Sequence, residues 1–151
     1  MINVNRRDFL IVASGAAAAF VAGLPAIAVA AGDEMATAIE AFTGGAAVSE
    51  GDISIDLPEI AENGNTVPIA VSIDSPMTSD SYVKSVTVLA SGNPSPGVAT
   101  FHFSPASGSA EASTRLRLAK TQDVVVLAAM SDGSFRKAVS TVKVTIGGCG
   151  G

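Results

Sequence analysis

The last five residues of the chain, Gly147 to Gly151, read Gly-Gly-Cys-Gly-Gly, and Cys149 is the only cysteine among the 151 residues. One cysteine cannot close a disulfide within its own chain, so the thiol is available for chemistry or for a partner. An exposed free thiol is a liability in an oxidising compartment. The residue type and its place therefore favour a functional thiol over an accidental terminal cysteine.

The flanking glycines predict how such a thiol is presented. Glycine loses more backbone freedom on ordering than any other residue, so we expect Gly147, Gly148, Gly150 and Gly151 to form a mobile arm. Cys149 is the third residue after Ile146, where the apolar pattern ends, which gives a reach of roughly 10 Å at full extension. A thin arm of this kind can enter a channel in another protein, which suits a covalent carrier.

The surroundings of Cys149 argue against catalysis by this chain. No Lys, Arg or His stands near it in the sequence, so we expect a partner enzyme to activate the thiol. A cysteine hydrolase needs a rigidly held base, which a glycine tether cannot offer to His102, the single histidine. An electron-transfer copper site needs two histidines, and Met77 and Met130 are better read as packing residues. The sequence therefore predicts a non-catalytic protein with no metal and no cofactor.

Residues 1–30 have the three parts of an export signal. A head with paired Arg6 and Arg7 precedes an apolar run, and small residues at 28–30 provide a cleavage pattern. The order of residues around the two arginines resembles the twin-arginine signal, which a receptor reads. Pro25 and several small residues interrupt the run, whereas a stable span needs about 20 apolar residues. We therefore expect export to the periplasm by the twin-arginine route, without a stable membrane anchor.

The charge balance indicates which class of partner is not expected. The chain has 9 Lys and Arg against 14 Asp and Glu, and without Arg6, Arg7 and Asp8 of the leader 7 remain against 13, a net charge of −6. A protein this acidic repels a phosphate backbone, so nucleic acid is not expected as a partner. Residues 31–146 are enough for one domain with one core.

The hydrophobic pattern predicts an all-β domain. Residues 33–43 have helical spacing and stop at Gly44 and Gly45; from residue 51 onward apolar residues alternate and turn residues recur about every ten positions. About seven short strands indicate an immunoglobulin-like antiparallel β-sandwich, with a β-barrel as the alternative. The expected strands lie within residues 51–60, 66–74, 83–90, 98–104, 113–119, 124–130 and 135–146.

Three local features accompany this pattern. Pro68 suits a strand at a sheet edge. The change of parity between Val139 and Val142 predicts a bulge in the last strand. Glu59 and Glu62 lie in a polar, turn-rich run, which favours a solvated loop or a docking edge over an acid and base pair.

Three features together carry a family resemblance. The terminal pentapeptide, the twin-arginine leader and the run IDLPEIAENGNTVPIAVSIDSPMT, residues 55–78, resemble the SoxY family of sulfur-oxidation carrier proteins. The resemblance implies that Cys149 is the covalent attachment site for sulfur intermediates. It implies that Gly147, Gly148, Gly150 and Gly151 form a swinging arm on an immunoglobulin-like sandwich.

The resemblance also implies partners. These are SoxZ in a tight heterodimer, a c-type haem SoxAX-like protein, a SoxB-like hydrolase and a SoxCD-like dehydrogenase, acting on sulfur species derived from thiosulfate.

Two other classes of function remain open on the residues alone. One is a structural or binding sandwich, or a metal-binding electron-transfer protein, whose terminal cysteine has no role. The other is a small sulfur carrier that works through a Gly-Gly carboxylate, here at Gly150 and Gly151, although the leader and the sandwich pattern speak against a cytosolic ubiquitin-like protein.

Overall fold

A computed structural model describes residues 31–149 of the chain. The expected leader, with Arg6 and Arg7, and the last two arm residues, Gly150 and Gly151, lie outside the described residues. Within 31–149 no helix is long and apolar enough to cross a lipid bilayer.

The described residues form one α-helix, nine strands and a short 3-10 turn. In chain order they are α2 (Ala31–Thr43), β1 (Val48–Glu50), β2 (Ile53–Asp56), β3 (Ile60–Asn63), β4 (Val67–Ile73), β5 (Val83–Ala90), β6 (Gly97–His102), the 3-10 turn (Pro105–Ser107), β7 (Ala110–Leu116), β8 (Gln122–Met130) and β9 (Phe135–Ile146).

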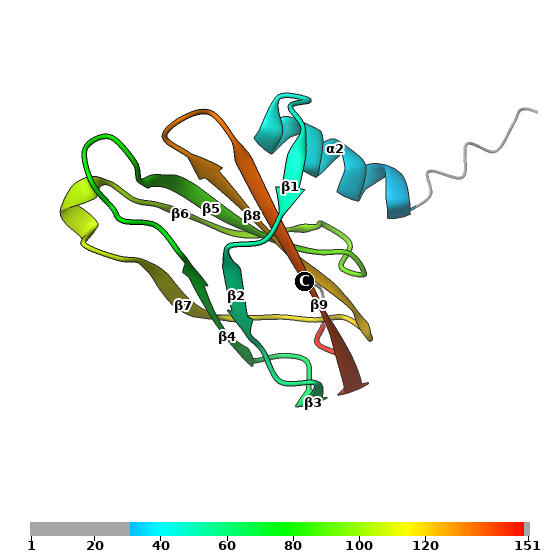
Figure 1. Ribbon diagram of the computed structural model, residues 1–151. Coiled ribbons are helices and arrows are strands. Elements are labelled where there is room, and N and C mark those ends of the chain that lie inside the picture. The colour runs from blue at the N-terminus through cyan, green and yellow to red at the C-terminus, as the bar shows by residue number, and fades with distance from the viewer. Residues whose placement is uncertain (1–30, 150–151) are drawn as a thin grey trace, which may run out of the picture.

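The strands make a two-layer sandwich (Figure 1). One sheet follows the order β1-β9-β8-β5-β6, with β3 paired to β9, and the other follows β2-β4-β7. Most neighbours are antiparallel, but β1 and β3 both pair with β9 in parallel. The expected immunoglobulin-like sandwich with a short N-terminal helix is therefore confirmed.

The core between the sheets is built from alternating side chains, as the sequence predicts. In β4 every second residue from Val67 to Ile73 is buried, and in β7 Leu116 faces inward while Arg115 faces solvent. Strand β8 is central, between β5 and β9, and its residues from Val124 to Ala128 are buried on both faces. Leu118, just past β7, is fully buried in the same core.

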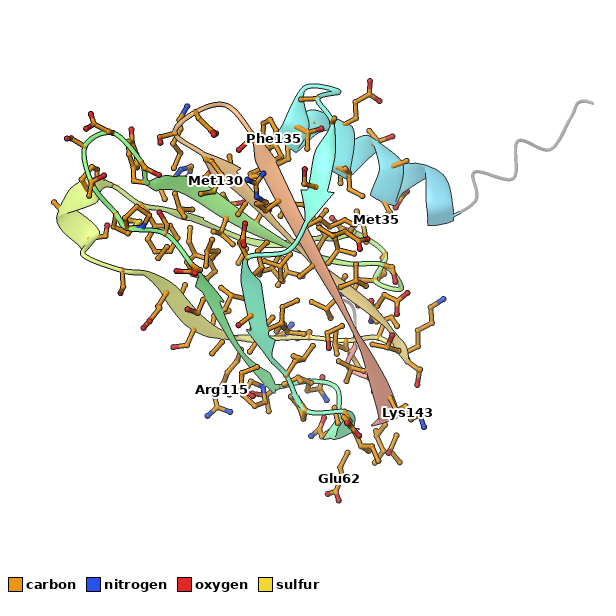
Figure 2. The ribbon with its side chains drawn as sticks, viewed as in Figure 1. Met35, Glu62, Arg115, Met130, Phe135 and Lys143 are labelled. Carbon is orange, nitrogen blue, oxygen red and sulfur yellow. The ribbon has the colours of Figure 1, made fainter. Side chains whose placement is uncertain are left out.

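Helix α2 covers part of the outer face of the larger sheet. Leu127 of β8 is buried there against the apolar side of the helix, which carries Met35 and Phe42. The ring of Phe42 meets that of Phe135 edge to face, with centroids 6.0 Å apart. Figure 2 shows Met35 and Phe135 on this side of the molecule. The helix ends as predicted, because Gly44 and Gly45 have φ values of 63° and 80° that favour glycine.

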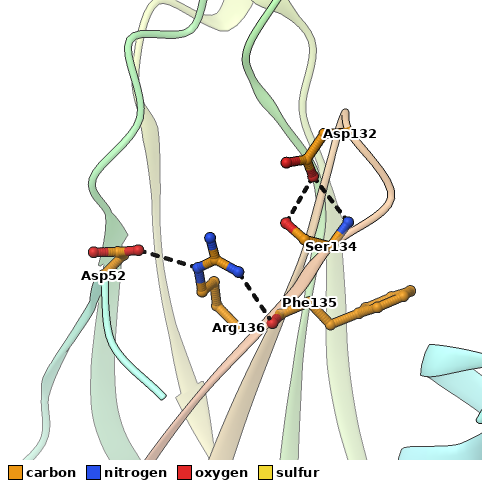
Figure 3. A network of polar contacts seen from close by, with 5 residues as sticks. All are labelled: Asp52, Asp132, Ser134, Phe135 and Arg136. Atoms are coloured by element: carbon orange, nitrogen blue, oxygen red, sulfur yellow. Dashed lines mark hydrogen bonds and ion pairs between the residues drawn. The ribbon is translucent and has the colours of Figure 1, made fainter. Parts of the chain in front are cut away.

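The segment from β1 to β3 crosses from the edge of one sheet to the other and back (Figure 1). The first crossing passes Asp52, whose φ of 60° turns the chain toward β2. Arg136 of β9 holds this corner, since its Nε donates to a carboxylate oxygen of Asp52 over 3.1 Å (Figure 3). The second crossing brings β3 to the far end of β9, where Asn63 pairs with Ile146.

Three expectations about strands were wrong. The run containing Glu62 is not a loop, because β3 pairs there with β9, Asn63 opposite Ile146. The last strand has no bulge between Val139 and Val142: its register with β8 is continuous, and the two side chains face opposite sides of the sheet. Pro68 lies in a central strand rather than at an edge, although β2 pairs with β4 only as far as Ala70 and ends before reaching the proline.

Candidate functional site

Cys149 lies three residues beyond the end of β9 and is a free, exposed cysteine. The preceding residue, Gly148, is buried. The chain therefore changes from a packed backbone to an exposed thiol within one residue.

Hydrogen bonds hold the first part of the arm against the domain. The N–H of Gly64, in the turn between β3 and β4, donates to the carbonyl of Ile146 over 2.7 Å, and the N–H of Leu118 donates to the carbonyl of Gly64 over 2.8 Å. The N–H of Gly148 in turn donates to the carbonyl of Leu118 over 2.8 Å. In Figure 1 the red segment after β9 runs beside the connection between β7 and β8. We call residues 147–149 the arm root, and Gly64, Asn65, Leu118 and Ala119 the dock.

Backbone meets backbone at this dock with no room for side chains. A Cβ on Gly148 would lie 2.7 Å from the carbonyl oxygen of Gly64, and one on Gly147 would overlap the carbonyl oxygen of Ala119. A Cβ on Gly64 would overlap the carbonyl oxygen of Leu118. Because real Cβ atoms avoid such contacts, close packing requires glycine at these three positions.

Asn65 is the side chain that reaches the cysteine itself. Its Oδ1 accepts the N–H of Cys149 over 3.2 Å. The side chain of Asn63 supports this arrangement, since its Oδ1 accepts the backbone N–H of Asn65 over 2.9 Å. An asparagine that bonds the backbone two residues on stabilises a tight turn. The end of β3 therefore places Asn65 where it can hold Cys149.

Buried polar side chains fix the other wall of the dock. Asn93, which is only 8% exposed, donates from Nδ2 to the carbonyl of Arg117 and accepts from the N–H of Ala119 through Oδ1. Gln122 donates to the same Oδ1 over 2.9 Å. A buried amide with its groups satisfied specifies one local backbone path. The position of Leu118 and Ala119 beneath the arm is therefore set by the core.

The hydrogen bonds that hold the docked arm and the entropic cost of ordering it are of comparable size. A protein hydrogen bond contributes about 0.5–1.5 kcal/mol net. Fixing the backbone of one residue costs about 1–2 kcal/mol. The two bonds made by the N–H groups of Gly148 and Cys149 therefore offset a similar cost of ordering those two residues, and the arm root is held by a small margin.

The surface near the dock is partly apolar. Ile146 is 64% exposed at the end of β9, and Ile60 is 59% exposed in the adjacent β3. Glu62 and Lys143 lie at this end of the molecule, and Figure 2 shows Glu62 pointing away from it.

The other residues considered from the sequence lie away from this site or within the core. His102 is exposed at the end of β6, the edge strand of the larger sheet. Met77 is buried in the core and Met130 packs against it, as predicted. Among residues 31–149 the structure brings together no group of three or more His, Cys, Asp and Glu side chains that could hold a metal ion.

The exposed thiol of Cys149 was predicted from the sequence, but the dock was not. It treated Gly147 and Gly148 only as flexible residues, whereas the structure packs them against Gly64. A signal was present: Gly64 stands between Asn63 and Asn65, and asparagine and glycine are residue types that favour tight turns. A turn of this composition inside a distinctive run could have indicated a functional loop.

The fold and the site together define a class of protein: an immunoglobulin-like sandwich that presents a single thiol on a glycine-rich chain end. The family described as sulfur oxidation protein SoxY matches residues 39–149. The chain belongs to this SoxY family.

A solved structure agrees with the family assignment. The sulfur carrier protein SoxY from Chlorobium limicola f thiosulfatophilum is 36% identical, with a TM-score of 0.65, over 76% of this chain and 99% of that one.

Two more distant structures share the fold alone. A superoxide reductase (neelaredoxin) from Ignicoccus hospitalis has a TM-score of 0.56 at 15% identity, over 62% of this chain and 80% of that chain. A putative superoxide reductase from Thermotoga maritima has a TM-score of 0.54 at 16% identity, over 64% and 93%. No curated protein sequence matches this chain.

Proposed function

We propose that this protein is a sulfur carrier of thiosulfate oxidation, which binds sulfur intermediates covalently through the thiol of Cys149. The observation that carries the proposal is an exposed, solitary thiol one residue beyond the last buried backbone of the arm. Membership of the SoxY family and the likeness to the Chlorobium sulfur carrier support it. Gly147, Gly148, Gly150 and Gly151 form the arm that presents the thiol.

The chemistry begins with oxidative coupling. The Cys149 thiol loses a proton and its sulfur forms a bond to the terminal sulfur of thiosulfate, and the two electrons released pass to a c-type haem SoxAX-like partner. The product is a cysteine S-thiosulfonate. This chain supplies the sulfur atom and the tether, and the partner supplies the oxidant and the activation of the thiol.

Hydrolysis then regenerates the carrier. In a SoxB-like hydrolase, water attacks the terminal sulfone, the bond between the two outer sulfurs breaks, and sulfate leaves while a persulfide stays on Cys149. A SoxCD-like dehydrogenase then accepts six electrons from the outer sulfur of the persulfide, which takes three oxygens from three water molecules and becomes a sulfonate, while six protons are released. A second hydrolysis releases sulfate and returns the thiol.

The proposal includes a location and a stable partner. Arg6 and Arg7 direct export to the periplasm by the twin-arginine route, where thiosulfate and the haem partner are accessible. A SoxZ-type protein forms a heterodimer with the sandwich, and the thiol remains free for successive enzymes.

Replacing Cys149 by serine tests this function. The Cys149→Ser variant should fold normally, because the residue is exposed, and should abolish growth on thiosulfate when it is the only copy in the cell. The His102→Ala variant is the matched control: it also removes an exposed side chain with reactive heteroatoms, and growth should be unaffected. Normal growth of the serine variant would indicate a structural or binding sandwich instead.

A further inference from the structure

Glycines occur in two different environments in this protein. Those in the turns at Gly44, Gly45 and Gly133 face open space, because an added Cβ would meet nothing within 4 Å, and their positive φ explains the residue type. Gly147 and Gly148 do not have a positive φ. Instead, they meet the backbone of the dock at distances that exclude a side chain. Mobility alone would not require such a fit.

From this fit we propose that the arm is latched at its root, and that Asn65 is the positioning residue that holds Cys149 in the latched state. The latch consists of the bond from the Gly148 N–H to the Leu118 carbonyl and the bond from the Cys149 N–H to Asn65 Oδ1. The role of the latch rests on the proposed carrier function, whereas the existence of the latch does not depend on that function.

The latch defines two working lengths for the arm. When it is closed, the backbone is fixed as far as the N–H of Cys149, and the side chain of the cysteine, with whatever is bound to it, extends from the surface. When it opens, residues 147–149 are released and the thiol gains a reach of roughly 10 Å. The closed state keeps the sulfur at one place on the surface, and the open state lets it enter a partner.

The composition of the root keeps this equilibrium easy to shift. Glycine gains more backbone freedom on release than any other residue, which favours opening. The hydrogen bonds and the close backbone packing favour closing. A partner enzyme that binds the open arm therefore needs only a modest differential affinity to open the latch.

Nuclear magnetic resonance of the ¹⁵N-labelled full chain tests the latch directly. In the wild type the heteronuclear relaxation of the Gly148 and Cys149 amides should lie between that of β9 and that of a free chain end, and their exchange with solvent should be slower than that of an unprotected amide. Asn65→Ala should shift the closed-to-open ratio about fivefold toward open, the effect of losing one hydrogen bond, and exchange at both amides should rise accordingly. The amides of Gly64 and Leu118 report whether the dock itself remains intact.

Two further variants separate positioning from general loosening. Asn65→Asp keeps an acceptor oxygen at the same place and should restore the wild-type exchange rates. Thr66→Ala removes a neighbouring exposed side chain outside the latch and should change nothing. Wild-type amides at 148 and 149 as mobile as a free chain end, or equal exchange in the Asn65→Ala and wild-type proteins, would overturn the latch.

This result is independent of the carrier function. If the latch is absent but Cys149→Ser still abolishes growth on thiosulfate, only the latch fails. If the latch is present and the serine variant grows normally, the carrier function fails. If both the latch and the carrier function are confirmed, Asn65→Ala should change the apparent KM of a partner enzyme for the carrier, and Asn65→Asp should restore it.

Discussion

At the scale of single residues, the protein separates the reactive group from the groups that hold it. Cys149 is exposed, whereas Gly148, next to it, is buried and fits only as glycine. Asn65 connects the two regions through one hydrogen bond to the cysteine backbone. Because this contact uses the N–H and not the thiol, the sulfur stays available while the chain that carries it is fixed.

The pKa of Asp132, in the hairpin between β8 and β9, leads to a prediction about a single residue. The hydroxyl and the backbone N–H of Ser134 both donate to the Asp132 carboxylate and hold its pKa below the ordinary value of an aspartate (Figure 3). Because the folded pKa is lowered, the stabilisation is present above the pKa of the unfolded chain and is lost as pH falls through the folded value. Ser134→Ala should raise the Asp132 pKa toward its ordinary value, measured by carbon-detected NMR titration. An unchanged pKa would show that the hydrogen bond from the Ser134 hydroxyl does not form in solution.

At the scale of elements, helix α2 is a cover for the outer face of the larger sheet. It buries Leu127 completely and brings Phe42 against Phe135 of β9. Where the helix does not reach, the same face is open, as at Val139, which is 50% exposed. The helix therefore adds a second, smaller core to the one between the sheets.

Truncation of Leu127 measures the contribution of that second core. Leu127→Ala leaves a cavity beneath the helix and should lower the free energy of unfolding by about 2–5 kcal/mol. Val139→Ala, on the same face but half exposed, should lower it by less than about 1 kcal/mol. Denaturant unfolding followed by circular dichroism provides both values. Equal losses in the two variants would mean that the helix does not pack on the sheet.

The sequence predicted the elements whose signal is local. Alternation of apolar and polar residues revealed β4, and an apolar run revealed β8. Strands β1 and β3 were missed because they have three and four residues, and their pairing with β9 joins residues about 85 apart in the chain. No local pattern encodes such a pairing.

The same limit applies to the site. Cys149 could be predicted because its chemistry and its glycine neighbours are visible in the sequence. The dock could not, since it joins the turn at Gly64, the connection at Leu118 and the arm at Gly148, which meet only after the sheets have formed. The bulge expected near Val139 was wrong because the two valines lie on opposite faces of a regular strand: Val142 faces the core, and Val139 is half exposed on the outer face.

At the scale of the whole molecule, the fold places a rigid sandwich behind a short reactive chain end. The buried amides of Asn93 and Gln122 tie the dock to the main core, so the position of the arm root follows from the folding of the domain. The sandwich offers partners a stable body and a fixed starting point for the arm. In the proposed function, the catalytic groups belong to those partners.

The central claim is that sulfur intermediates are carried on Cys149, and mass spectrometry of the protein isolated from thiosulfate-grown cells tests it most directly. The account predicts thiosulfonate, persulfide or sulfonate masses on the C-terminal peptide, and none of these on the same peptide of the Cys149→Ser protein. An unmodified Cys149 under every condition in which the cells oxidise thiosulfate would contradict it.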